Sequence, residues 1–271
     1  MSQTINDSLN KPDSINGYAT VNGLSMYYEI HGKGAPLVLV HGGGSTIRTT
    51  FGKILPIFSK NHKVIAVEIQ AHGHTADIDR PLTFEQDADD IAALLKQLHI
   101  DKADFLGFSN GASTTLQFAI RHPEMTNKIV VASTFYKKSG APNWFWDMMR
   151  KPTFEGMPQA YKDAFLEINP DTNALHRMYE RDVARMKAFQ DIPDEQMKSI
   201  KAPALVIIGD KDVVTPEHAV EMHNLLAGSR LIILPGAHGE YIGELTTPQD
   251  SVLISSTVSM INKFLSEETT K

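Results

Sequence analysis

The sequence contains no cysteine among its 271 residues. Disulfide bonds, thiolate metal ligands and a cysteine nucleophile are therefore excluded. It also has no excess of positive charge, because 26 Lys and Arg residues stand against 32 Asp and Glu residues, a formal net charge of −6. Nucleic acids and anionic membrane surfaces require a basic face. Neither is therefore expected as a main partner.

Long apolar runs are missing as well. No stretch approaches the roughly 20 apolar residues that span a bilayer, and the polar residues 1–16 lack the apolar centre of a signal peptide. We therefore expect a cytoplasmic protein with no membrane partner, and an exported protein whose signal peptide has been removed is the alternative. The composition is otherwise ordinary, with 42% hydrophobic and 21% charged residues. A chain of this length can bury a large core without covalent or metal crosslinks.

Short apolar runs recur along the chain and predict an α/β fold. Residues 18–21 and 24–30 flank Asn22-Gly23, a pair suited to a tight hairpin. Continuous apolar runs are typical of strands covered on both faces, as in a parallel sheet. Six such runs follow, at 36–40, 63–67, 103–106, 128–132, 204–208 and 231–234. Helical periodicity lies between or after them, at 87–98, 112–120, 216–226 and 252–264.

One region interrupts this alternation. Residues 139–200 have a helical pattern throughout and contain no clear buried strand. We predict a polar tail at 1–17, a core formed by 18–138 and 201–271, and an inserted helical cap at 139–200. Aromatic and methionine side chains in such a cap either pack on the core or line an apolar pocket. The candidate substrate contacts are Phe135, Trp144, Trp146 and Met149.

The strongest motif is Gly107-Phe108-Ser109-Asn110-Gly111, which follows one predicted strand and opens a helix. A G-x-S-x-G sequence in this context places serine on a strained turn with its hydroxyl exposed. The N-terminus of the following helix stabilises negative charge that develops there. Because the motif alone is weak, a glycine-flanked loop serine is the alternative.

A serine nucleophile needs a base to accept its proton and an acid to orient that base. Two later predicted strands end in suitable residues. The strand at 204–208 is followed by Asp210 and Asp212, and the strand at 231–234 is followed by His238. Open α/β sheets place their sites at the carboxyl ends of strands. The residue types therefore occur at successive strand ends in the order Ser, Asp, His, which is the order used in this class of fold.

With these motifs the chain resembles the α/β-hydrolase superfamily, in its cap-bearing branch of serine esterases and lactonases. The resemblance extends from about residue 18 to residue 264. It implies a mostly parallel central sheet with an inserted helical cap. It also implies that Ser109 is the nucleophile, His238 the general base and Asp212 the orienting acid, with Asp210 as the fallback.

The same resemblance implies an oxyanion hole made of backbone N–H groups. One is that of Asn110, directly after the nucleophile, and the other is that of Gly43, within the run Gly42–Gly44 that follows the strand at 36–40. A tight turn is the alternative use of these glycines. Two such donors stabilise the tetrahedral intermediate of acyl transfer.

No cofactor or metal is expected. The sequence lacks a P-loop motif and a strand-flanked G-x-G-x-x-G. His41 is interpreted as a structural residue that holds the loop of Gly42–Gly44, which we call the glycine loop. His72 and His74 are conceivable metal ligands with a nearby acid, but no known ligand spacing supports them. They lie in a segment where the family usually has an acidic residue followed by arginine, glycine and serine. Because this chain differs there, the resemblance does not imply the details of the pocket chemistry.

The predicted function is hydrolysis of carboxylic esters with an apolar acyl or ring group, through an acyl-enzyme on Ser109. A lactonase acting on enol-lactones or acyl-homoserine lactones is the alternative within hydrolysis. A lyase of the hydroxynitrile type, assisted by Lys137, Lys138 or Lys162, and a non-catalytic small-molecule receptor are the alternatives from other classes. The sequence contains no signal for the oligomeric state.

Overall fold

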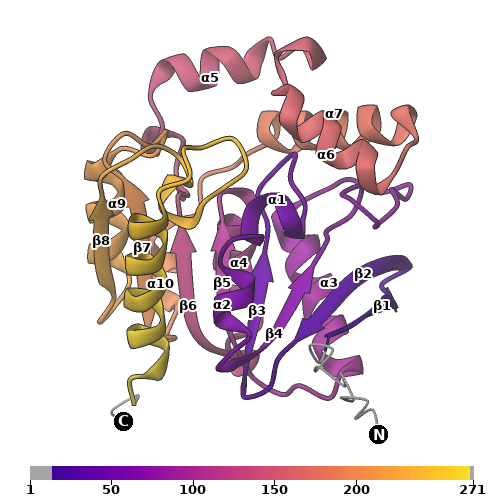
Figure 1. Ribbon diagram of the computed structural model, residues 1–271. Coiled ribbons are helices and arrows are strands. Elements are labelled where there is room, and N and C mark those ends of the chain that lie inside the picture. Colours follow the sequence, from indigo (N-terminus) through magenta and orange to yellow (C-terminus); the bar gives the residue numbers. More distant parts are fainter. Residues whose placement is uncertain (1–13, 269–271) are drawn as a thin grey trace, which may run out of the picture.

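In the computed structural model, which describes residues 14–268, the apolar runs form one eight-stranded sheet (Figure 1). The strands are β1 (Ser14–Val21), β2 (Leu24–His31), β3 (Ala35–Val40), β4 (His62–Val67), β5 (Ala103–Phe108), β6 (Thr126–Ala132), β7 (Ala204–Gly209) and β8 (Arg230–Leu234). Their order across the sheet is β1-β2-β4-β3-β5-β6-β7-β8. β1 pairs antiparallel with β2 and β2 with β4, whereas every pair from β4 to β8 is parallel. The predicted α/β fold with a mostly parallel sheet is therefore confirmed.

The amino-terminal strand begins earlier than the sequence predicts. β1 starts at Ser14, so residues 14–17 of the predicted polar tail pair with β2 in the hairpin that turns at Asn22-Gly23. Polar residues are tolerated there because β1 is an edge strand and its first residues are largely exposed. The remainder of the predicted tail, residues 1–13, lies outside the described residues.

Helices cover both faces of the sheet. Residues 14–268 contain α1 (Ile47–Phe51), α2 (Leu55–Phe58), α3 (Phe84–Gln97), α4 (Asn110–Arg121), α5 (Asn143–Arg150), α6 (Gln159–Ile168), α7 (Thr172–Lys187), α8 (Asp194–Ser199), α9 (Pro216–Leu225) and α10 (Ser251–Ser266). Short 3₁₀ helices are η1 (Pro123–Met125), η2 (Lys138–Gly140), η3 (Phe154–Gly156) and η4 (Glu240–Ile242). None of the helices in the described range is long and apolar enough to cross a membrane.

The alternation of side chains along the strands divides the core into two layers. In β3, Val38 and Val40 pack with α3, α4, α8 and α9 on one face, whereas Leu37 and Leu39 pack with α1, α2 and α10 on the other. Both faces of a central strand are therefore buried, as its continuous apolar sequence predicts.

Between β6 and β7, where every residue is described, the chain forms only helices and loops. α5, α6 and α7, which we call the cap helices, lie over the end of the sheet at which β3 and β6 finish (Figure 1). α8 differs from them: it packs against α4 and α9, and Met197 is fully buried in the main core. The part of 139–200 that lies over the sheet thus ends before α8. The carboxyl ends of the parallel strands face the cap helices, and the candidate site residues lie there.

Candidate active site

Ser109 lies on a sharp turn between β5 and α4. Its backbone has φ 54° and ψ −122°, a conformation that residues with a side chain rarely adopt. Ser109 directly precedes the first turn of α4. Its N–H donates to the carbonyl of Ala132 at 2.8 Å, which ties the turn to β6. Among the described residues, its hydroxyl has no hydrogen-bond partner and remains free in a cavity.

The two glycines of the motif permit this turn because the backbone approaches closely on both sides. A Cβ atom on Gly111 would lie 2.0 Å from the carbonyl oxygen of Val40 in β3. A Cβ on Gly107 would lie 2.3 Å from the carbonyl oxygen of Gly111. Real Cβ atoms do not approach oxygen so closely, so the packing of α4 against β3 and β5 requires glycine at both positions.

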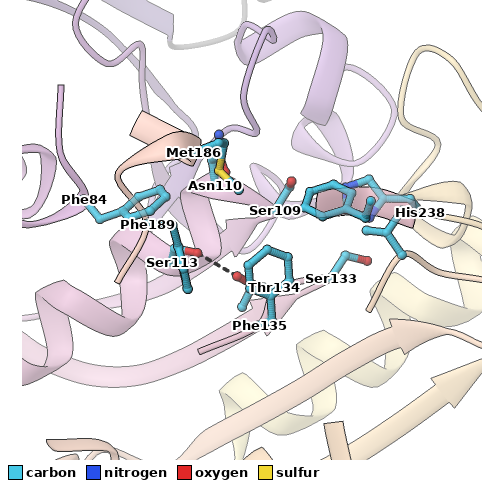
Figure 2. A pocket seen from close by; sticks show the side chains of 12 residues that line it. Phe84, Ser109, Asn110, Ser113, Ser133, Thr134, Phe135, Met186, Phe189 and His238 are labelled. Atoms are coloured by element: carbon cyan, nitrogen blue, oxygen red, sulfur yellow. Dashed lines mark hydrogen bonds between the residues drawn. The ribbon is translucent and has the colours of Figure 1, made fainter. Parts of the chain in front are cut away.

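His238 and Asp212 form a hydrogen-bonded pair beside this turn. The imidazole Nδ1 lies 2.7 Å from Asp212 Oδ1. Because a carboxylate only accepts, Nδ1 donates and Nε2 is left as the basic nitrogen. His238 and Ser109 line the same cavity, and Figure 2 shows Ser109 lying between Asn110 and His238 in that view. The structure thus brings the three predicted triad residues to one end of the sheet.

Asp212 is held by further donors. Its side chain is inaccessible to solvent, Oδ2 accepts from the Ser133 hydroxyl, and Oδ1 accepts from the Val214 N–H at 3.3 Å. Burial alone would raise its pKa, but the positive imidazolium of His238 and these hydrogen bonds outweigh burial and lower the pKa. Asp212 is therefore a carboxylate at neutral pH.

Asp210, the fallback acid, has a different environment. It is exposed, and its Oδ1 accepts from the Gly236 N–H at 2.8 Å, which joins the loop after β7 to the loop after β8. No contact with His238 is recorded for it in the described part of the chain. The geometry favours Asp212.

Two carboxylates influence the protonation of His238. Burial lowers its pKa, but the charge of Asp212, their hydrogen bond and the charge of Glu244 act in the opposite direction and raise the pKa above the ordinary value of 6.5. Glu244 is almost fully buried, at 1% exposure, and accepts from the Tyr161 hydroxyl of α6 at 2.7 Å. The base is thus tuned by a side chain that contacts the cap helices.

The glycine loop presents one free N–H group to the site. The Gly42 N–H donates to Thr50 Oγ1 at 3.4 Å, and the Gly44 N–H donates to Asp182 Oδ2 at 2.6 Å. Within residues 14–268, neither the Gly43 N–H nor the Asn110 N–H has an acceptor. These are the two donors that the sequence assigns to the oxyanion hole, and that assignment stays a prediction.

The cavity next to Ser109 has a volume of about 120 Å³. Its walls contain three hydroxyl side chains, Ser113, Ser133 and Thr134, of which Ser113 and Thr134 are hydrogen-bonded at 2.7 Å (Figure 2). The apolar part of the wall consists of Phe84, Phe135, Phe145, Met186, Phe189 and Val213. Four of the six apolar side chains in the wall are therefore phenylalanines.

Of the four predicted substrate contacts, only Phe135 lies in this wall, and its role in binding stays a prediction. The other three do not line this cavity, and their assignment as substrate contacts stays a prediction. Trp144 is 56% exposed. Trp146 donates from Nε1 to the carbonyl of Lys138 at 2.7 Å and packs edge-on against Phe135, and Met149 packs partly buried against the main core. These side chains support the wall or face solvent.

Sequence reasoning missed several residues around the site. Ser133 has φ 54° and follows β6 directly, so the rule that sites lie at strand ends would have identified it. Glu244 and Asp182 had no such signal, because their partners are distant in sequence.

His72 and His74 do not converge on a common site. His72 Nε2 lies 3.0 Å from Asp182 Oδ2, whereas His74 Nδ1 lies 2.9 Å from Glu68 Oε2. In the described part of the chain, no group of three or more metal-ligating side chains is arranged to hold an ion. His41 contacts the glycine loop through Nδ1 and the Gly42 carbonyl at 2.7 Å, and burial lowers its pKa to about 3.

The fold and the order of these residues along the strands define the class of hydrolytic enzymes built on an α/β sheet. The family model described as "Alpha/beta hydrolase family" matches residues 37–242, which is more than half of the chain. The chain belongs to the alpha/beta hydrolase family, as the sequence motifs predict.

Known relatives in this family are hydrolases. The chain is 29% identical over 245 residues to the human serine hydrolase BPHL, a match covering 82% of this chain and 79% of the relative. It is 27% identical to the pimeloyl-[acyl-carrier protein] methyl ester esterase of Neisseria meningitidis, covering 75% of this chain and 86% of the relative. The crystal structure of the enol-lactonase from Burkholderia xenovorans LB400 matches with a TM-score of 0.73 at 26% identity, covering 92% of this chain and all of that one.

The two acidic candidates are separated by a pair of amide substitutions. We expect Asp212→Asn to lower kcat by about 10⁴-fold, because the amide favours the wrong tautomer of His238. Asp210→Asn should leave kcat close to the wild-type value, since the amide oxygen of Asn can still accept from the Gly236 N–H. Steady-state ester hydrolysis measures both. A large loss in Asp210→Asn with an active Asp212→Asn would assign the acid to Asp210.

The pH profile tests how His238 is tuned. Since only the neutral imidazole accepts a proton, kcat/KM should rise with pH through a midpoint above 6.5. Glu244→Gln removes a nearby negative charge, which destabilises the imidazolium, lowers the His238 pKa and moves the midpoint to lower pH. Glu240→Gln, on the same loop, is the matched control and should leave it unchanged. A midpoint that rises or stays fixed in Glu244→Gln would contradict this account.

Proposed function

We propose that the protein is a serine hydrolase of carboxylic esters that acts through an acyl-enzyme on Ser109. The observation that carries the proposal is one cavity lined by a free serine hydroxyl and by a histidine that is hydrogen-bonded to a buried carboxylate. The N–H groups of Gly43, in the glycine loop, and of Asn110, at the start of α4, have no acceptor among residues 14–268. The relatives named above, which are serine hydrolases and esterases, support the same reaction class.

In the proposed mechanism, Ser109 Oγ attacks the ester carbonyl carbon while His238 Nε2 accepts the hydroxyl proton. The carbonyl oxygen becomes an oxyanion that accepts hydrogen bonds from the Gly43 and Asn110 N–H groups. When the tetrahedral intermediate collapses, the imidazolium returns the proton to the leaving alcohol. Water then attacks the acyl-enzyme, His238 accepts its proton, and the carboxylic acid is released. Asp212 keeps Nδ1 protonated and stabilises the imidazolium.

The cavity supports a small apolar acyl group as substrate. Its volume of about 120 Å³ is near that of an engineered apolar cavity of about 150 Å³ that binds benzene. A single six-membered ring or a short chain of similar volume fits this space. The aromatic side chains of the wall give such a group favourable ring contacts.

A lactone is the second candidate substrate, favoured by the likeness to the enol-lactonase structure. The chemistry is unchanged except that the leaving alcohol remains tethered to the acyl group. The lyase alternative has less support. Lys137 pairs with Asp194 at 2.7 Å on the surface, and Lys162 lies over the Phe154 ring, while none of the three candidate lysines lines the cavity.

The proposal is tested by proton release in a pH-stat with a panel of esters and lactones. Because of the cavity volume, kcat/KM should be highest for benzoyl esters and for acyl chains of about four to six carbons, and should fall for chains above about ten carbons. Ser109→Ala should abolish release, since the nucleophile is lost. Faster release from lactones than from matched esters would select the lactonase. Absence of release from every substrate, or release that survives in Ser109→Ala, would overturn the proposal.

A further inference from the structure

One cap side chain reaches the glycine loop from above. Asp182, in α7, is separated from Gly44 by 138 residues of sequence, yet its Oδ2 accepts from the Gly44 N–H at 2.6 Å. The same oxygen lies 3.0 Å from His72 Nε2, and Oδ1 accepts from Arg185 Nη2 at 2.5 Å. The carboxylate is 14% exposed. Asp182 therefore joins the cap helices directly to the loop that carries Gly43.

The charge of Asp182 is balanced within the protein. Arg185, 2% exposed, also donates from Nη1 to Asp87 Oδ2 at 2.8 Å, and its guanidinium lies 4.8 Å from the centre of the Phe84 ring. Burial alone would raise the pKa of Asp182, but His72, Arg185 and the Gly44 N–H outweigh it and hold the pKa well below its usual range. The group that accepts from Gly44 is thus a carboxylate, and such charge-assisted bonds are about twice as strong as neutral ones.

The contact lies at the predicted oxyanion hole. A Cβ atom built on Gly43 would be 3.2 Å from Asp182 Oδ2 and 2.3 Å from Asn110 Nδ2, so Gly43 lies between the cap carboxylate and the residue after the nucleophile. Gly44 has φ 65°, a left-handed conformation that glycine adopts without strain. A strong bond to its N–H fixes the orientation of the peptide that joins Gly43 to Gly44.

The core holds the other side of this loop, and within the loop the Ser45 hydroxyl donates to the Gly43 carbonyl at 3.3 Å. His41 Nδ1 and Thr50 Oγ1 bond the carbonyl and the N–H of Gly42. Gly43 therefore lies between one residue fixed by the core and one residue fixed by the cap. A donor of the oxyanion hole must be held in place before the reaction, because its benefit depends on not having to reorganise.

We propose that Asp182 is a positioning residue that fixes Gly44 and thereby presents the Gly43 N–H to the oxyanion. The oxyanion hole is complete only when α7 is docked on the glycine loop, so binding under the cap and stabilisation of the tetrahedral intermediate are coupled. This inference rests on the proposed function. It assigns Asp182 no contact with the substrate, because both of its oxygens already have donors.

A second ion pair of α7 provides a matched control. Arg181 donates from Nε to Asp77 at 3.0 Å, and this pair ties the same helix to the core without contact with the glycine loop. Asp77→Ala therefore removes a cap anchor and one hydrogen bond from Gln70 at 2.8 Å, but no bond to the glycine loop. Asp182→Ala removes a cap anchor together with the bond to Gly44.

The test compares Asp182→Ala, Asp182→Asn, Asp77→Ala and Ser109→Ala in the full chain, with the best ester from the pH-stat panel. Loss of one oxyanion-hole donor costs about 10²–10³ in kcat, so a misplaced donor in Asp182→Ala should cost about 10- to 100-fold with KM little changed. Asp182→Asn keeps an acceptor oxygen without the charge and should lie between Asp182→Ala and wild type. Asp77→Ala should keep the wild-type kcat.

Phenylboronic acid supplies a second readout, because its tetrahedral adduct with serine places an oxygen in the oxyanion hole. Its inhibition constant should rise in Asp182→Ala by the same factor by which kcat falls, and should not change in Asp77→Ala. Equal kcat and equal boronate affinity in the two variants, or an effect on KM alone, would overturn the inference. If Asp182→Ala does not fold, Asp182→Asn against Asp77→Asn decides by the same criteria. Turnover that survives in Ser109→Ala would instead contradict the proposed function.

Discussion

The arrangement of the candidate site depends on the contact between Gly111 and the backbone of β3. A side chain at this position would collide with the carbonyl oxygen of Val40, so glycine lets the N-terminus of α4 lie directly on the strand. Ser109, the residue before α4, makes the connection from β5 to this helix in a positive-φ turn. The strain at Ser109 is sustained because packing on both sides determines the backbone there. At the start of the same helix, the Asn110 N–H has no acceptor in the part of the chain that the structure describes.

Both the sheet and the cap insertion contribute residues to the site. The sheet contributes Ser109, Asp212 and His238 at its strand ends, but the walls of the cavity come partly from Phe145, Met186 and Phe189 of the 139–200 insertion. Two polar contacts join cap and core beside the chemistry. Tyr161 bonds to Glu244 near His238, and Asp182 bonds to Gly44 near the predicted oxyanion hole. Changes in the cap sequence are therefore expected to affect both the acyl pocket and the catalytic groups, which explains how one fold supports different substrates.

The sequence predicts the sheet and the triad positions better than the pocket. Strand ends can be located from apolar runs. Residues that closely follow them, such as Ser109 and His238, are then placed at the same edge of a parallel sheet. Both Asp210 and Asp212 follow the same strand, so the choice of Asp212 came from the resemblance to the family, and the hydrogen bond of Asp212 to His238 agrees with it. Pocket contacts depend instead on how each cap helix is rotated on the core. Trp144 and Phe145 are neighbours in sequence, yet Trp144 is 56% exposed whereas Phe145 is 8% exposed and lines the cavity.

The central claim is that Ser109 is an activated nucleophile, and labelling with an alkyl fluorophosphonate tests it most directly. Intact-mass measurement followed by peptide mapping gives the number of adducts and their position. The account predicts one phosphonyl group per chain, on Ser109, formed much more slowly when His238 is replaced by alanine. Absence of an adduct on the wild-type chain, or a single adduct on another residue such as Ser113 or Ser133, would contradict it.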